Sequence, residues 1–160
     1  MERVWAPWRL KYVRSKKTAG CIFCETIRKR RDNLLVFKSR HSFAVLNLYP
    51  YNNGHILISP RRHVKSIEQL TDTEILDLMH SLKRAKKILD KELKPQGYNI
   101  GINLSGAAGA GITGHLHLHI VPRWKGDTNF MPVLAGTKVI SQSLDELSRK
   151  LKRHVDAERN

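Results

Sequence analysis

Three histidines alternate with aliphatic residues in the segment His115-Leu116-His117-Leu118-His119. Successive side chains of an extended strand point to opposite faces. A strand here would place three imidazoles on one face, roughly 7 Å apart, and the aliphatic side chains on the other. Imidazole is a nucleophile, a proton carrier and a metal ligand, and it titrates near neutral pH. The pattern therefore predicts a half-buried strand whose polar face carries chemistry; a chance polar face and a pure metal site are the alternatives.

A loop of small residues precedes this segment. Residues 105–114 read Ser-Gly-Ala-Ala-Gly-Ala-Gly-Ile-Thr-Gly. Such a run leaves backbone N–H groups accessible and lets a bulky anion approach closely. Most loops of this kind only connect elements. One that leads directly into a histidine strand is a candidate for holding a phosphate against a nucleophile.

The chain is strongly basic. Its 160 residues fit one domain, and 29 lysines and arginines against 14 acidic residues give a net charge of +15. Such a field attracts anions, so nucleotides and polyphosphates are expected partners, and nucleic acid is a second interpretation that we do not favour. No stretch is long and apolar enough to cross a membrane, and the N-terminus lacks the layout of a secretory signal. We therefore expect no membrane partner and a cytoplasmic location.

The two cysteines, Cys21 and Cys24, have the spacing C-x-x-C. In a cytoplasmic chain this spacing favours metal binding or redox chemistry over a structural disulfide. A thioredoxin-like role would need a strand-to-helix turn in a βαβ unit, which the pattern lacks. Two thiolates make half of a tetrahedral zinc site, and histidines are the natural donors for the other half. Two idle cysteines are the alternative.

The periodicity divides the chain into an N-terminal arm, residues 1–20, and one domain, residues 21–160, that includes a C-terminal helix. Thr71 and Glu74 form a candidate capping box at the start of the longer helix. Short turns between several strands favour antiparallel pairing. The sequence thus predicts an α+β fold with a five-stranded, mainly antiparallel sheet and two helices. The expected strands are 34–38, 42–47, 55–59, 98–104 and the histidine segment; the expected helices are 71–93 and 141–154, with a short additional helix at 24–31.

The histidine segment, followed by Ile120 and Val121, resembles the signature of the histidine triad (HIT) superfamily. The resemblance extends over residues 47–55, 60–64 and 99–103, and it covers roughly residues 21–140. Two further segments, 45–55 and 122–130, and the N-terminal Trp-Ala-Pro-Trp-Arg-Leu are similar to the bacterial diadenosine tetraphosphate (Ap4A) phosphorylase branch. The resemblance implies a HIT-like fold, a homodimer, and an enzyme that cleaves adenine dinucleoside polyphosphates.

The resemblance also implies a role for individual residues. His117 would attack the α-phosphorus and form a covalent nucleotidyl-histidine, His119 would stabilise the transition state, and His55 would lie near the same phosphates. The nucleotidyl group would then pass to water or to inorganic phosphate, and the histidine strand alone does not decide which. The remaining implied contacts are Asn47 to the ribose; Asn103, Gly109, Ala110 and Gly111 to phosphate; and Ile22, Phe23 and Val45 to the base.

Zinc-bearing members of the superfamily imply a structural zinc ion here, and the implied ligands are Cys21, Cys24, His63 and His115. The alternative is a metal-free site in which His115 only forms hydrogen bonds.

The chain departs from many hydrolase-type members, which carry glutamine four residues before the first triad histidine, where this chain has Gly111. That difference leaves the backbone to assist the leaving group or the water. The third triad position is His119 and not glutamine, which argues against the hexose-1-phosphate uridylyltransferase relatives.

Three other functions stay open at this stage. One is a nucleoside phosphoramidase that splits adenosine phosphoramidates. Another is a basic nucleic-acid-binding protein in which the triad is vestigial and binding depends on salt. The last is a zinc-dependent regulatory module without catalysis. An intact fold without turnover after His117→Ala would separate the enzymes from the other two.

Overall fold

The computed structural model describes residues 20–28, 34–127 and 140–158. The predicted N-terminal arm lies, except for Gly20, outside the described residues. Within the described part of the chain, no helix is long and apolar enough to span a bilayer.

The sheet has five strands in the order β1-β2-β3-β5-β4, and every neighbouring pair is antiparallel. This confirms the predicted α+β fold with a five-stranded antiparallel sheet, and the first four strands lie within two residues of their expected bounds. β4 lies at one edge of the sheet, paired only with β5 among the described strands. The strands are β1 (Leu35–Lys38), β2 (Ser42–Leu46), β3 (Ile56–Pro60), β4 (Gly97–Ile102) and β5 (Leu118–Arg123).

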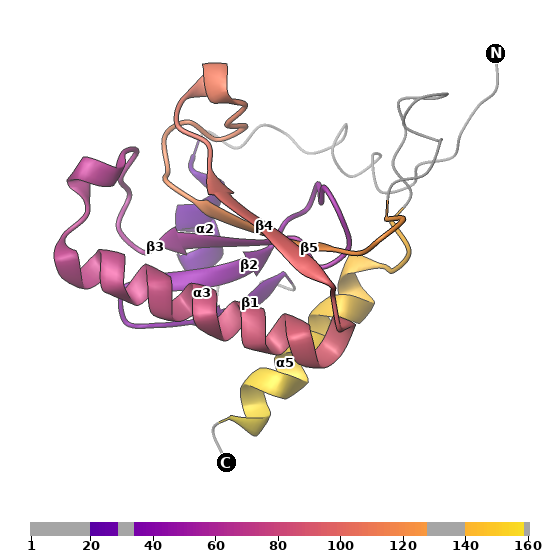
Figure 1. The fold of residues 1–160 in the computed structure, drawn as a ribbon. Coiled ribbons are helices and arrows are strands. Elements are labelled where there is room, and N and C mark those ends of the chain that lie inside the picture. The colour runs from indigo at the N-terminus through magenta and orange to yellow at the C-terminus, as the bar shows by residue number, and fades with distance from the viewer. Residues whose placement is uncertain (1–19, 29–33, 128–139, 159–160) are drawn as a thin grey trace.

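Two long helices, α3 (Asp72–Leu93) and α5 (Leu144–Ala157), cover one face of the sheet, and a short helix, α2 (Ile22–Arg28), lies on the opposite face (Figure 1). The fold prediction counted two helices, and the described residues contain three. The third is the short helix expected at 24–31, which begins two residues earlier, at Ile22. The Thr71 capping box is present as predicted. α5 begins three residues later than expected because Ser143 is its N-cap. Two 3-10 turns complete the fold: η1 (Ile67–Gln69) and η2 (Gly106–Ala108).

Alternation along the central strands builds two separate cores. Leu46 and Ile58 pack with α3 and α5 in the larger core. Val45 and Leu57 point the other way and pack with Phe23 of α2 in the smaller one. Because side chains alternate along β5 as well, the histidines share the face that α2 covers.

β5 begins at Leu118, so only the third triad histidine lies within the strand, and the prediction that the strand starts at His115 is wrong. The ladder stops here because β3 ends at Pro60, which has no N–H to donate. The backbone N–H of Leu116 donates instead to the carbonyl oxygen of Val64, at 2.7 Å. The first two histidines therefore sit on an extended segment that the loop after β3 holds in place.

Candidate active site and metal centre

The three triad histidines form one row of buried rings, as the alternating pattern predicted. His115, His117 and His119 are 1%, 5% and 8% exposed. The ring centroids of His117 and His119 are 5.0 Å apart. Phe23 of α2 packs beneath the row, with its ring 5.2 Å from that of His115 and 5.1 Å from that of His117. The short helix therefore supports the histidines from the side opposite the main core.

One hydrogen bond fixes the tautomer of His117. Its Nδ1 lies 2.9 Å from the carbonyl oxygen of His115. A carbonyl oxygen can only accept, so Nδ1 of a neutral ring carries the proton and Nε2 carries the lone pair. A neutral imidazole nitrogen with a free lone pair is the form that acts as a nucleophile.

A second chain of hydrogen bonds runs through His55. The backbone N–H of Tyr51 donates to Nδ1 of His55 at 3.0 Å, which leaves the proton of a neutral His55 ring on Nε2. That nitrogen lies 2.9 Å from Nδ1 of His119, so His119 accepts there and carries its own proton on Nε2. Among the described residues, the buried Nε2 of His119 has no hydrogen-bond partner. The chain therefore ends on a buried donor that has no partner among the described residues.

Burial keeps these rings neutral. It lowers the pKa of His55 to about 3, with smaller contributions from the nearby rings of His119 and His117. Burial likewise lowers the pKa of His119 to about 4, with a smaller contribution from His117. The pKa of His115 is also lowered, mainly by burial. At neutral pH the hydrogen-bond directions deduced above for His55 and His119 therefore hold.

The loop between β2 and β3 holds His55 through residues that the sequence reasoning read only as turn formers or as a ribose contact. The side chain of Asn47 donates to Nδ1 of His55 at 3.1 Å and accepts from the N–H of Tyr49 at 3.0 Å. The ring of Tyr51 stacks on that of His119, 5.6 Å away with an angle of 9° between the planes. Asn52 is buried and donates to the carbonyl oxygen of Pro122. No local pattern could have found this contact, since the partners are 70 residues apart.

The residues that the resemblance assigned to the base lie on and beneath α2. Ile22 is 50% exposed at the start of α2, whereas Phe23 is buried against the triad rings. Val45 is buried in the same small core as Phe23. Of the three, only Ile22 offers a substantial exposed surface.

The residues assigned to phosphate lie in the loop that follows β4. The N–H groups of Gly109 and Ala110 donate to carbonyl oxygens within the loop, at 3.0 and 3.2 Å. Gly109 has a φ of 85°, a conformation that glycine adopts without strain. Gly111 is exposed, and its N–H has no hydrogen-bond partner among the described residues. Asn103, at the start of the loop, has its side-chain nitrogen 3.9 Å from the position that a Cβ on Gly109 would occupy.

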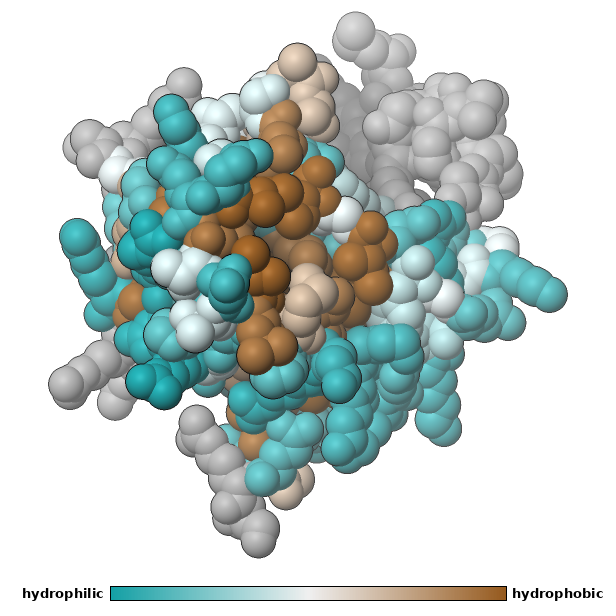
Figure 2. Space-filling view, turned by 60° about the vertical axis from the view of Figure 1, so that its left-hand side comes forward, coloured by the Kyte–Doolittle hydropathy of each residue, from teal (hydrophilic) through white to brown (hydrophobic). Residues whose placement is uncertain are grey.

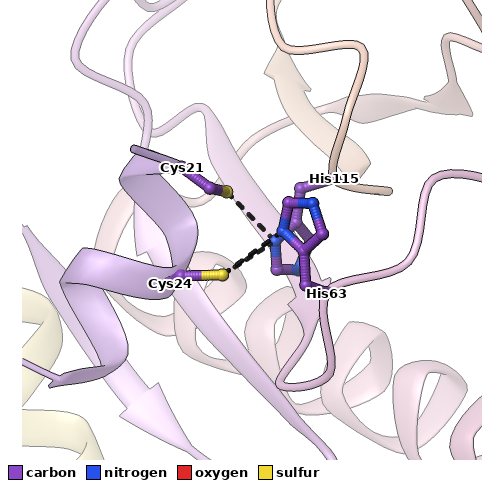
Figure 3. A group of neighbouring side chains, drawn as sticks. All are labelled: Cys21, Cys24, His63 and His115. Atoms are coloured by element: carbon purple, nitrogen blue, oxygen red, sulfur yellow. Dashed lines mark hydrogen bonds between the residues drawn. The ribbon is translucent and has the colours of Figure 1, made fainter. Parts of the chain in front are cut away.

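Two cysteines and two histidines meet at the other end of the histidine row (Figure 3). One potential ligand atom from each of the four lies within 4.8 Å of all the others, so the group could hold a metal ion. Nδ1 of His115 is 3.2 Å from Sγ of Cys21, and Nδ1 of His63 is 3.4 Å from Sγ of Cys24. Nε2 of His115 donates to the carbonyl oxygen of Pro60 at 2.9 Å, which leaves Nδ1 unprotonated and facing the sulfurs.

The fold and the site together define a class of protein, in which an antiparallel α+β domain presents a row of three histidines beside a loop of small residues. The HIT domain family matches residues 28–126 of this sequence. The chain therefore belongs to the HIT family.

Two curated relatives illustrate what members of this family do. The protein is 37% identical over 161 aligned residues to the AP-4-A phosphorylase of Mycobacterium tuberculosis, and the alignment covers 94% of this chain and 83% of the relative. It is 35% identical over 91 residues to the asymmetrical bis(5'-nucleosyl)-tetraphosphatase of Schizosaccharomyces pombe, which covers 57% of this chain and 50% of that enzyme.

Solved structures share the fold. A hypothetical histidine triad nucleotide-binding protein from Sulfolobus tokodaii superposes with a TM-score of 0.70 at 24% identity, and the match covers 86% of this chain and 93% of that chain. A zinc-bound histidine triad family protein from Mycobacterium smegmatis superposes with a TM-score of 0.69 at 23% identity, and the match covers 86% of this chain and 96% of that chain.

Proposed function

We propose that this protein cleaves adenine dinucleoside polyphosphates such as Ap4A through a covalent nucleotidyl intermediate on His117. The observation that carries the proposal is the hydrogen bond from Nδ1 of His117 to the carbonyl oxygen of His115, because it leaves Nε2 free to attack. The AP-4-A phosphorylase of M. tuberculosis supports the substrate class. The net charge of +15 favours the capture of a polyphosphate.

In the first step, Nε2 of His117 attacks the α-phosphorus in line. The P–N bond forms as the P–O bond to the leaving polyphosphate breaks, so that Ap4A would release ATP and leave AMP on the ring. The ring gains positive charge, which the carbonyl oxygen of His115 stabilises through Nδ1–H. The unpartnered Nε2–H of His119 donates to a phosphoryl oxygen, and His55 holds His119 in the required tautomer.

In the second step, an acceptor attacks the phosphorus and breaks the P–N bond. Inorganic phosphate as the acceptor yields ADP, and water yields AMP. We assign the phosphate contacts to Asn103 and to the loop Gly109–Ala110–Gly111, where the backbone N–H of Gly111 has no partner within the described residues. We assign the ribose to Asn47 and the base to the surface formed by Ile22 over Phe23 and Val45.

We further propose that Cys21, Cys24, His63 and His115 hold a structural zinc ion. Zinc–sulfur and zinc–nitrogen distances near 2.3 and 2.0–2.1 Å give tetrahedral edges of about 3.5 Å between sulfur and nitrogen. The sulfur–nitrogen distances of 3.2, 3.4 and 3.6 Å fit that edge. The ion would cross-link α2, the loop after β3 and the histidine segment, and it would take no part in the reaction. Cys21 and Cys24 form no disulfide, as expected for metal-binding cysteines in a reducing compartment such as the proposed cytoplasm.

A homodimer is the proposed assembly. β4 is an edge strand of the sheet that the described residues form, and Ile100 on it is 48% exposed. Ile67, Ile75 and Met79 are also exposed and line a common hollow with Ile102 of β4. Figure 2 shows the hydrophobic surface gathered on this face of the molecule. An exposed apolar patch beside an unpaired strand edge favours pairing with a second copy.

Incubation of the protein with Ap4A, with and without inorganic phosphate, tests the function. ADP with ATP, formed only when phosphate is present, is the result expected of a phosphorylase. AMP with ATP would indicate a hydrolase on the same intermediate. Cleavage of an adenosine phosphoramidate without cleavage of Ap4A would overturn the substrate assignment. Failure to trap a nucleotidyl adduct on His117 by mass spectrometry during turnover would overturn the mechanism.

A further inference from the structure

His63 is the exposed member of the proposed metal ligands, and it lies on the loop between β3 and α3. Its ring nitrogen Nδ1 is 3.4 Å from Sγ of Cys24. A ligand on an exposed loop binds tightly only if the loop is already ordered, since ordering it on binding costs conformational entropy. The residues on either side of His63 are therefore the place to look for what fixes it.

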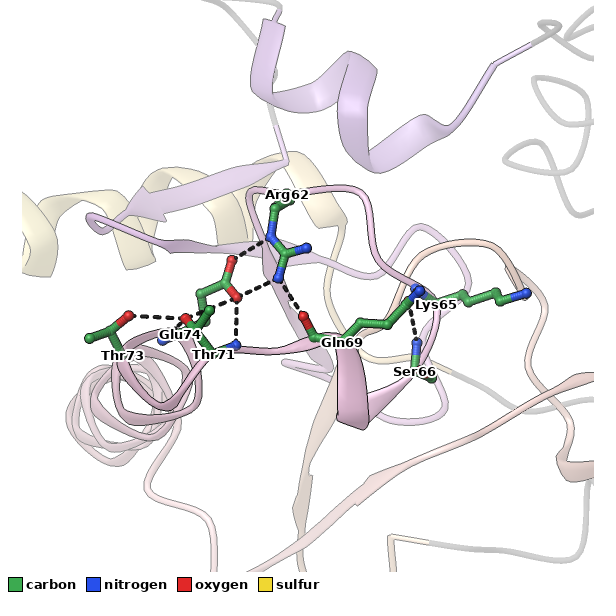
Figure 4. Close-up of polar contacts among 7 residues, drawn as sticks. All are labelled: Arg62, Lys65, Ser66, Gln69, Thr71, Thr73 and Glu74. Carbon is green, nitrogen blue, oxygen red and sulfur yellow. Dashed lines mark hydrogen bonds and ion pairs between the residues drawn. The ribbon is translucent and has the colours of Figure 1, made fainter.

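The residue before it, Arg62, forms a two-pronged ion pair with Glu74 in the first turn of α3. Nε of Arg62 donates to Oε1 at 2.9 Å, and Nη2 donates to Oε2 at 2.7 Å (Figure 4). Glu74 is only 7% exposed, and it also accepts from the N–H of Thr71 at 2.9 Å. Paired charged hydrogen bonds of this geometry are strong and directional.

The rest of the loop is tied down by Gln69. Its carbonyl oxygen accepts from Nη2 of Arg62, and its side-chain oxygen accepts from the N–H groups of Lys65 and Ser66, at 2.9 and 3.3 Å. The residue after His63, Val64, is buried, and its carbonyl oxygen accepts from the backbone N–H of Leu116 at 2.7 Å. His63 thus lies between two fixed neighbours.

We infer that the Arg62–Glu74 ion pair is a positioning device for the metal ligand His63. It connects the start of α3 to the residue next to the ligand, so that the imidazole stands beside Cys24 before a metal ion arrives. The inference rests on the metal site proposed above and not on the catalytic mechanism. Outer partners that orient metal ligands commonly change metal affinity by about 10–100-fold.

Competition with a chromophoric chelator tests the inference on the full-length protein. Glu74→Gln removes the negative charge of the pair. Arg62→Lys keeps the positive charge but cannot make the two parallel hydrogen bonds of the guanidinium. We expect both variants to bind Zn²⁺ about 10–100-fold more weakly than the wild type. The control is Lys86→Gln, which breaks an exposed ion pair with Asp90 on the same helix and should leave the affinity unchanged. Because Arg62 is half-exposed, Arg62→Lys keeps the test valid if Glu74→Gln fails to fold.

A double variant separates positioning from general loss of stability. In a His63→Ala background, Glu74→Gln should cause no further loss of zinc affinity, because the ligand it positions is gone. The visible spectrum of bound Co²⁺ should change in Glu74→Gln in the same direction as in His63→Ala. An equal loss of affinity with and without His63, or wild-type affinity in both single variants, would overturn the inference. A wild-type protein that binds neither ion overturns the metal site itself, whatever the result with Ap4A.

Discussion

Nε2 of His55 donates to Nδ1 of His119 across 2.9 Å, although 64 residues separate them in the sequence. The bond decides which nitrogen of His119 carries a proton, and that proton is the buried donor without a partner among the described residues. His55 therefore acts on the substrate through His119 in the proposed mechanism.

This relationship predicts a hierarchy of activity losses. His117→Ala should lower kcat by about 10⁴-fold or more, because it removes the nucleophile. His119→Ala should lower kcat by about 10²–10³-fold, as the loss of a transition-state donor does. His55→Ala should cost less than His119→Ala and should add nothing to it in the double variant. Steady-state kinetics with Ap4A check the order, with the exposed His80→Ala as the control. If the fold losses in kcat of His55→Ala and His119→Ala multiplied in the double variant, His55 would not act through His119 alone.

The buried imidazoles predict how stability depends on pH. The pKa of His55 is lowered to about 3 and that of His119 to about 4, below the usual value near 6.5. As pH falls below about 6.5, the unfolded chain binds protons at these rings and the native state does not. The free energy of unfolding should therefore fall by up to about 1.4 kcal/mol per pH unit for each ring.

Urea unfolding between pH 7 and pH 5, at constant metal loading, measures that slope. His55→Asn should make it shallower, whereas His80→Gln, at an exposed position, should not. An unchanged slope in His55→Asn would mean that the His55 ring binds protons equally well in the native and unfolded states, so that its pKa is not lowered by burial.

Removal of the proposed zinc ion should destabilise the fold. An ion held 100-fold above its Kd stabilises the native state by about 2.7 kcal/mol, so a chelator should lower Tm in the wild type. Cys24→Ser should have a lower Tm without the chelator and respond little to it. Differential scanning calorimetry with and without the chelator provides the comparison. His80→Gln should respond as the wild type does; an equal response in Cys24→Ser would exclude this ligand set.

Gly54 is a position where the backbone and the packing both exclude a side chain. Its φ is 76°, and a Cβ there would lie 2.5 Å from Cδ1 of Leu93. Gly54→Ala should therefore cost about 2–4 kcal/mol from the left-handed conformation and overpacking together. Gly97→Ala, with nothing within 4 Å of the added Cβ, is the matched control. Equal midpoints of urea unfolding in the two variants would contradict both the backbone strain and the overpacking against Leu93.

The proposed dimer predicts that a charge on the edge strand gives a monomer. Ile100→Arg places a guanidinium on exposed β4, and light scattering should report half the wild-type mass. Leu76→Arg, at an exposed residue of α3 that does not line the hollow, should leave the mass unchanged. A wild-type protein that is monomeric at micromolar concentration would remove this surface from consideration.

Much of the fold could be predicted from the sequence because its determinants are local. Alternating apolar residues specified the strands, and Thr71 with Glu74 specified the start of α3. The errors lie where a distant partner overrides the local pattern. The histidine segment reads as one strand from His115, but β3 ends at Pro60, and so the ladder starts at Leu118.

The sequence by itself predicted which residues carry the proposed chemistry: the spacing of the triad set its three rings on one face, and the resemblance named the four residues that come together in a group able to hold a metal ion. Only the tertiary structure decided how those groups are protonated and held. The tautomers of His117 and His119 depend on which carbonyl or ring nitrogen lies within hydrogen-bond distance, and the support of His63 depends on a carboxylate from the next helix. Hydrogen bonds are short-ranged and directional, so they depend on positions in space that residue spacing along the chain does not encode.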